Sequence, residues 1–152
     1  MIDCHVPAER QLKLFHKYPE LFEYALDSRT DKNMHPITLY HIECWNGWMN
    51  IIEKMSSEIA AIDTNKVIKV LQIKQKFAGL RYYYTWTEDK PDYLDNISKI
   101  TSDYETLSFE TCEVCGNPGS RATNHGYILT LCRNCMKTED FKDYRRPKNK
   151  NA

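Results

Sequence analysis

Two segments of the chain repeat their apolar residues at the spacing of an α-helix, with intervals of four, three, four and three residues. The first consists of Trp48, Ile52, Met55, Ile59 and Ile62. The second follows Pro91 and consists of Tyr93, Ile97, Ile100, Tyr104 and Leu107. This spacing places one apolar stripe along each helix. Asn46 stands before the first stripe, where its side-chain oxygen can cap a helix.

The stretch between the two predicted helices is typical of a β-hairpin. Residues 67–75 are rich in β-branched side chains, and residues 80–87 include three consecutive tyrosines. Ala78 and Gly79 separate the two runs, which places Gly79 in the turn region. Each helix can bury one face against this sheet. The sequence therefore predicts an α+β body in which two amphipathic helices pack on a small antiparallel sheet.

The chain before this body has a weaker pattern. Residues 7–26 predict a helix that Pro19 kinks or splits, because its ring clashes with the carbonyl four residues earlier. Residues 27–36 are polar and predict a loop, and residues 37–44 predict a short strand. We divide the chain into an N-terminal helical region (1–36), the α+β body (37–109), a C-terminal zinc ribbon (110–140) and a basic flexible tail (141–152).

The composition bears on where the protein acts. No run of about 18 apolar residues predicts a membrane span, and the first residues lack the apolar core of a signal peptide. We therefore expect a cytoplasmic protein without membrane contact. The six cysteines should then be reduced, so that their spacing indicates metal binding rather than a disulfide scaffold.

Four cysteines have the spacing of a metal site. Cys112 and Cys115 form one C-x2-C pair, and Cys132 and Cys135 form another after a gap of 16 residues. Two such pairs can surround one ion with four thiolates, as in structural zinc sites. Turns and a short strand fill the gap, as in a zinc ribbon. We expect Zn²⁺ with a structural role.

Paired cysteines also occur in other kinds of site. Two disulfides do not suit a reducing compartment, and a C-x2-C redox site needs only one pair near a βαβ unit. A catalytic zinc requires an open coordination position. An iron–sulfur cluster on four thiolates stays open. His125 can replace one cysteine, although its place before Gly126 favours a turn.

A second candidate site lies near residues 41–44. His41, Glu43 and Cys44 offer a base, a carboxylate and a thiol for an enzyme or a second metal. On a strand, His41 and Glu43 would face one side and Cys44 the other, which opposes convergence. A small buried thiol is the alternative for Cys44. Cys4 has no assigned role.

The charges balance in total but not along the chain. The sequence has 21 basic and 21 acidic residues, and this balance argues against binding nucleic acid through overall charge. Residues 119–152, however, contain eight basic and three acidic residues, so this end carries +5 and the rest −5. Basic residues also alternate with aromatic rings in the hairpin, as on surfaces that bind single strands. A half-buried sheet produces the same alternation without a ligand, with alternate tyrosines packed on the helices and lysines on the solvent face, and we favour this interpretation. The candidate contacts for nucleic acid or a protein partner are Lys74, Lys76, Arg81, Arg121, Arg133, Arg145 and Arg146.

Four blocks of the sequence resemble a family of small, uncharacterised proteins of bacteriophages, prophages and bacteria. They read IECWNGWMNII (42–52), QIKQKFAGLRYYY (72–84), TCEVCGNPGS (111–120) and TLCRNC (130–135). Ala78 stands where the family pattern has glycine. The resemblance implies a phage-associated protein acting in the host cytoplasm and brings no catalytic residue. We therefore expect a zinc-binding interaction protein that modulates a host or phage macromolecule, such as a host defence enzyme. The alternatives are a nucleic-acid-binding accessory protein and an enzyme at residues 41–44.

Overall fold

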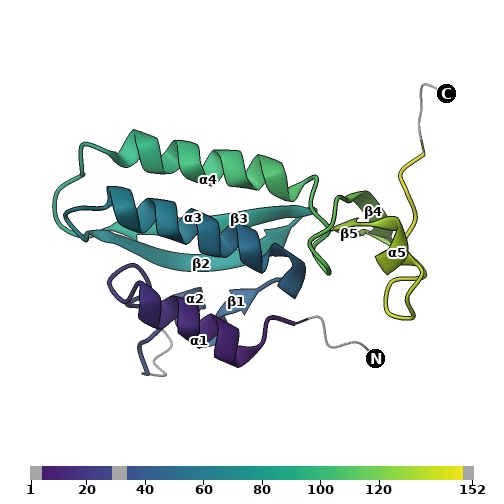
Figure 1. Cartoon of the computed structure of the whole chain (residues 1–152), viewed down its shortest axis with the longest axis horizontal. Helices are drawn as coiled ribbons and strands as arrows, with labels where there is room; N and C mark the ends of the chain where they lie inside the picture. Colours follow the sequence, from purple (N-terminus) through teal and green to yellow (C-terminus); the bar gives the residue numbers. More distant parts are fainter. Residues whose placement is uncertain (1–4, 29–33, 149–152) are drawn as a thin grey trace.

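The computed structural model describes residues 5–28 and 34–148, and it confirms the predicted α+β fold. In Figure 1, two long helices run side by side along a hairpin, and a small two-stranded ribbon sits at one end of this body. The long helices are α3 (Met49–Ile62) and α4 (Leu94–Ser108), and the hairpin strands are β2 (Ile68–Lys76) and β3 (Gly79–Trp86). The helices α1 (Ala8–Lys17) and α2 (Pro36–Tyr40) lie on the other side of the long strands from α4 in this view.

The main sheet has three strands in the order β1-β2-β3. The hairpin strands pair antiparallel, whereas the two-residue strand β1 (Ile42–Glu43) joins β2 in parallel. The register shifts between Val70 and Gln72, where β2 has a bulge or irregularity. Beyond the reach of β1, the N–H of Val70 donates to the carbonyl of Leu21, so the turns after α1 also border this strand.

The core forms where the helices meet the sheet. Its largest fully buried side chains come from α1, α2, both long helices and the hairpin, and include Phe15, Ile37, Trp48, Ile52, Ile73 and Ile97. The hydroxyls of Ser56 on α3 and Tyr82 on β3 form a buried hydrogen bond of 2.9 Å across this interface. The apolar stripe predicted for α4 is not buried along its whole length, because Leu107, the last residue of the stripe, is 45% exposed.

The strand predicted over residues 37–44 is wrong for its first part. Residues 36–40 form α2, and only Ile42 and Glu43 are paired as a strand. Pro36 occupies the first helical turn after the extended residue His35, a position that suits its fixed φ. Ile37 and Thr38 are buried from this helix, so packing overrides the strand preference of β-branched residues. At His41, φ is +55°, and the helix ends.

The prediction that Asn46 caps a helix is also wrong. Asn46 begins the 3₁₀ turn η1 (Asn46–Trp48), which leads into α3 without a side-chain cap. Its Oδ1 instead accepts a hydrogen bond of 3.1 Å from the guanidinium of Arg10 on α1. The same guanidinium pairs with Glu53 at 2.6 Å. The Asn46 side chain therefore joins α1 to the start of α3.

The hairpin turn lies one residue earlier than predicted. Phe77 and Ala78 form the turn, with φ values of +52° and +70°, and Gly79 already pairs with Lys76 in the ladder. Positive φ at both central residues is the geometry that favours glycine or asparagine in two-residue hairpin turns. Ala78 adopts this conformation at the position where the resemblance leads us to expect glycine.

The C-terminal ribbon consists of β4 (Ser120–Asn124), β5 (Tyr127–Leu131) and the short helix α5 (Arg133–Met136). Its packing continues past residue 140, where the sequence suggested the start of a tail. Phe141 is 5% exposed in the ribbon core, and Arg145 exchanges backbone hydrogen bonds of 2.8 Å with Thr123. An aromatic residue within the basic segment accounts for this difference, because it supplies apolar surface to bury.

Candidate metal centre

The four predicted cysteines meet at one point of the ribbon. Cys112 and Cys115 lie in the loop after α4, Cys132 precedes α5 and Cys135 lies in it. Their Sγ atoms all lie within 4.8 Å of one another, and those of Cys115 and Cys132 are 3.6 Å apart. A tetrahedron with metal–sulfur bonds of about 2.3 Å has edges of about 3.8 Å. The cluster therefore has the composition and the size to hold one metal ion.

Each cysteine pair forms a tight loop with its own backbone hydrogen bonds. In the first, the Gly116 N–H donates to the Cys112 carbonyl at 2.9 Å, and Gly116 has a φ of +84°. In the second, the Cys135 N–H points at the Cys132 sulfur at 3.4 Å. These contacts fix the directions of the sulfur atoms before any ion is bound.

The pKa values of the thiols depend on their burial and on the neighbouring cysteines. Burial raises the pKa of Cys132, but hydrogen bonds from the Cys135 N–H and the neighbouring thiols outweigh it and bring the pKa to about 7. Burial and the neighbouring thiols raise the pKa of Cys135 above its ordinary value. The lowered pKa of Cys132 and the raised pKa of Cys135 mean that Cys132 loses its proton more readily than Cys135. A bound cation reverses the second effect, because it stabilises every thiolate.

The ribbon is held on the body by the segment that precedes α3. The indole Nε1 of Trp48 donates a hydrogen bond of 2.8 Å to the Thr111 carbonyl. Gly47 is buried against the backbone of the first cysteine loop and leaves no room for a Cβ atom. The N–H of Trp45 donates to Oε2 of Glu113 at 3.1 Å. These contacts tie the metal centre to the start of α3.

Trp45, which precedes α3 in the chain, packs against the apolar core of the ribbon. The ring of Trp45 meets the buried ring of Phe141 edge-on, with centroids 5.6 Å apart. Ala122 and Leu131 complete the buried centre between the strands and the cysteines. The hairpin also reaches the ribbon, since the Thr130 hydroxyl donates to the Ala78 carbonyl at 2.8 Å.

Sequence patterns did not identify Trp45, Gly47 or Glu113 as parts of the centre. The block of residues 42–52 marked the first two as notable, but nothing in it indicated a contact with residues 111–115. Glu113 stands between two cysteines, where an exposed residue is expected, yet it is only 1% exposed. Burial raises the pKa of Glu113 to about 8, although the hydrogen bond from the Trp45 N–H acts in the opposite direction.

His125 does not belong to the cluster. It lies in the turn between β4 and β5 with a φ of +47°, as its position before Gly126 indicated. The cysteine quartet is the one group within residues 5–28 and 34–148 that can hold a metal ion with three or more His, Cys, Asp or Glu ligands.

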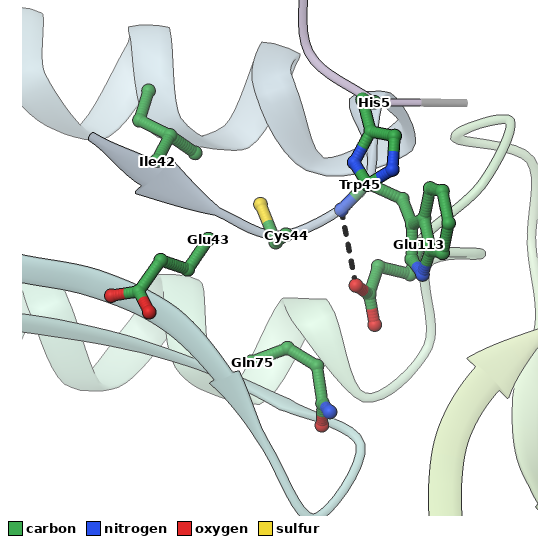
Figure 2. Close-up of a pocket in the computed structure, with 7 residues that line it drawn as sticks. All are labelled: His5, Ile42, Glu43, Cys44, Trp45, Gln75 and Glu113. Atoms are coloured by element: carbon green, nitrogen blue, oxygen red, sulfur yellow. Dashed lines mark hydrogen bonds between the residues drawn. The ribbon is translucent and has the colours of Figure 1, made fainter. Parts of the chain in front are cut away.

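The predicted trio of His41, Glu43 and Cys44 does not come together. Glu43 and Cys44 line a pocket of about 230 Å³, but the histidine in that pocket is His5 (Figure 2). His41 instead meets Phe15 edge-on, with ring centroids 5.6 Å apart. Burial, with a further contribution from Glu113, raises the pKa of Cys44 well above its ordinary value, so the thiol is not activated as a nucleophile. Cys4 lies outside the described residues.

Three of the basic candidate residues have partners within the chain. Arg81 pairs with Glu105 on α4, and Arg146 donates to the carbonyls of Ser120 and Leu131. Arg145 donates to the carbonyls of Lys142 and Tyr144. Lys76, Arg121 and Arg133 are exposed, and Lys74 is half-buried. Several of the predicted contact residues therefore have structural partners within the chain.

Comparison of the chain with protein-family models, with curated proteins and with solved structures gives no match. Within the described residues, none of the helices has the length and apolar character that crossing a membrane requires.

Proposed function

We propose that the cysteine cluster binds one structural Zn²⁺ and that the protein acts in the cytoplasm by binding and modulating a protein partner. The four thiolates of Cys112, Cys115, Cys132 and Cys135 would complete a tetrahedral shell and leave no position for a substrate. The donor set therefore supports a structural ion rather than a catalytic one. Thiolates also suit zinc better than magnesium or calcium, which prefer oxygen.

The zinc would stabilise a unit with little apolar core of its own. Structural zinc contributes on the order of 10–16 kcal/mol to the folding of small domains. The ribbon contains few buried apolar side chains, and most of its core surrounds the cysteines. Because Trp45, Gly47 and Trp48 join the ribbon to the body, this stabilisation would extend to the junction between them.

The observation that best supports a protein partner is the exposed apolar surface beside this junction. Phe77, at the tip of the hairpin, is 60% exposed, and Phe109, after α4, is 42% exposed. The two lie near each other, because the Phe109 ring packs over Gly79, two residues from Phe77. Exposed aromatic side chains of this kind are enriched in protein interfaces.

The sequence resemblance supports a phage-associated role. In that context the partner would be a host or phage macromolecule, and a host defence enzyme is the target that we propose to test first. The neutral overall charge favours a protein over nucleic acid as the main partner.

A pull-down from host cells after in-cell cross-linking tests this proposal. Tagged wild-type protein should retain a protein partner, and Phe77→Ser should lose it. Leu39→Ser is the matched control, because Leu39 is 46% exposed on α2, away from the hairpin tip. Equal retention by both variants, or release of the partner by nuclease treatment, would count against the proposal.

Nucleic acid is the second candidate partner, and the hairpin supports it. Lys74 and Arg81 are directly opposite in the β2–β3 register, so they share a face of the sheet with Tyr83, which is 42% exposed. Filter binding of single-stranded DNA and RNA at about 50 mM salt tests this candidate, because phosphate contacts are strongest at low salt. No retention under these conditions excludes it.

A further inference from the structure

A pocket of about 230 Å³ lies between the body and the first cysteine loop. Its walls come from four distant parts of the sequence, namely the N-terminal segment at His5, strand β1 with the following turn, the hairpin at Gln75 and the loop at Glu113 (Figure 2). Neither the metal centre nor the proposed partner surface uses it.

One oxygen of Glu113 lacks a partner in this pocket. The residue is 1% exposed, and its Oε2 accepts the hydrogen bond from Trp45. Its Oε1 has no hydrogen-bond partner among the described residues. Figure 2 shows this oxygen pointing away from Trp45, toward the side of the pocket where Gln75 lies. A buried acceptor without a donor is uncommon, because it has lost water and gained nothing in return.

Gln75 does not provide the missing donor. Its Oε1 accepts a hydrogen bond of 3.1 Å from the Ala78 N–H, which ties the side chain to the hairpin turn. The Cys44 thiol also lines the pocket, but it does not donate to Oε1 of Glu113, and Figure 2 shows its sulfur pointing to another side. None of the described side chains around the pocket therefore donates to this oxygen.

The remaining walls indicate the chemistry of the missing donor. Glu43 lines another side of the pocket, where its carboxylate accepts a hydrogen bond of 3.1 Å from Gln72 and points away from Glu113 (Figure 2). The residues that line the pocket include no lysine or arginine. The rings of His5 and Trp45 form an aromatic wall, with centroids 4.4 Å apart and planes tilted by 31°. A charged nitrogen beside the buried Glu113 carboxyl stabilises its ionised form, and carboxylates form their strongest hydrogen bonds with charged nitrogen donors. Aromatic faces also attract cations.

We propose that this pocket binds an organic cation that carries an alkylammonium or alkylguanidinium group. The nitrogen donates to Oε1 of Glu113, Glu43 adds a second negative charge, and the alkyl stem lies against Trp45. The group can belong to a free amine or to a basic side chain of another protein. The proposal stands independently of the zinc and of the partner surface at Phe77.

A titration followed by amide and indole NMR signals tests the pocket in the full chain. The cationic probes are n-propylammonium and n-propylguanidinium, and n-propanol and n-propylurea are their neutral counterparts. We expect saturable shifts of the Trp45 signals with the cations and at least tenfold weaker binding of the neutral compounds. A blocked glycine pentapeptide with a central arginine distinguishes a protein side chain from a free cation as the natural ligand. Tenfold tighter binding of this peptide than of n-propylguanidinium indicates a protein side chain, and equal binding indicates a free cation.

Three variants locate the site. Glu113→Gln should weaken n-propylguanidinium at least tenfold, and Glu43→Gln, which changes an exposed side chain of β1, should weaken it about threefold. Glu110→Gln is the matched control, because this exposed glutamate is on the same loop but outside the pocket. Metal content is measured in each variant, so that loss of the ribbon is not mistaken for loss of binding.

The proposal is overturned by any of three results. The first is the absence of saturable shifts, which would mean that a water molecule is the partner of Oε1. The second is equal binding of charged and neutral probes. The third is binding that stays unchanged in both Glu43→Gln and Glu113→Gln. Because Glu43 lies outside the cysteine loop, its variant keeps the test decisive even if Glu113→Gln disturbs the ribbon.

Discussion

Gly47 lies so close to Cys112 that a Cβ atom added to it would stand 2.4 Å from the Cys112 carbonyl oxygen. The same atom would be 2.4 Å from the Glu113 carbonyl oxygen and 2.6 Å from the Cys115 nitrogen. All three are backbone atoms, so no side chain can move aside to make room. The start of α3 and the first cysteine loop are therefore fitted to each other at a glycine.

Gly47→Ala should separate the ribbon from the body. We expect a loss of about 3 kcal/mol or more in the free energy of unfolding, because overpacking against backbone forces one element to shift. Release of zinc to a chelator should also become faster. Gly126→Ala is the control, since an added Cβ meets nothing within 4 Å there and only the φ of +91° opposes it. That variant should lose about 1 kcal/mol and keep its zinc. A smaller effect of Gly47→Ala than of the control would refute the fit.

Trp48→Phe tests the hydrogen bond that joins α3 to the ribbon. Trp48 is fully buried, and its indole N–H donates to the Thr111 carbonyl. Removing the donor leaves a carbonyl unsatisfied, at a cost of about 1–3 kcal/mol in urea unfolding. Trp86→Phe changes a side chain that is 38% exposed and should stay within about 0.5 kcal/mol of the wild type. Similar losses in the two variants would show that the Trp48 bond contributes nothing specific.

The buried Tyr82 predicts sensitivity to alkali. Burial raises its pKa well above 10, although the Ser56 hydrogen bond opposes this shift. The folded protein therefore keeps the proton at a pH where the unfolded chain releases it. Its stabilising contribution is complete below about pH 10 and falls above it, by up to about 1.4 kcal/mol per pH unit.

Urea unfolding at pH 8 and pH 11 measures this effect. Tyr82→Phe should lose less free energy of unfolding between the two pH values than the wild type does, although it starts lower because Ser56 loses its partner. Tyr127→Phe changes a side chain that is 73% exposed and should follow the wild type. An unchanged alkaline loss in Tyr82→Phe would assign the sensitivity to other groups.

Cys44 should be an unreactive thiol. Burial and the nearby Glu113 raise its pKa, and the thiolate is the form that reacts with iodoacetamide. Native wild-type protein and Cys44→Ala should therefore take up the same number of labels at pH 7.5, and they should differ by one label in urea. Cys44→Ala should also lower the free energy of unfolding by about 1 kcal/mol, because it leaves a small void. Rapid native labelling of Cys44 would instead support a reactive site.

The elements with a long, regular pattern were predictable from the sequence. The four-three spacing identified α3 and α4, and the β-branched run identified β2, because burial against one layer imposes a period on the sequence. The cysteine spacing located the four-thiol cluster, because four ligands of one ion must meet around one point. Short segments were less predictable. Residues 36–40 became a helix through Pro36 and the burial of Ile37, which are effects of local capping and packing.

The contacts between distant segments were not predictable from periodicity. Nothing in the sequence indicates that Gly47 faces Cys112, that Asn46 pairs with Arg10, or that Glu113 is buried beside Trp45. Each of these contacts depends on the tertiary arrangement of the chain. The spacing of apolar residues along the sequence carries no information about that arrangement. The same holds for the pocket at His5, whose walls are brought together only by the tertiary structure.

Native mass spectrometry of the purified protein is the most direct test of the structural zinc. We expect one Zn²⁺ for each chain, its loss in a Cys112→Ala and Cys132→Ala double variant, and its retention in Cys44→Ala. The double variant should also lose the folded ribbon. A protein without metal, a mass increase that corresponds to an iron–sulfur cluster, or one metal retained unchanged in the double variant would rule out the structural zinc.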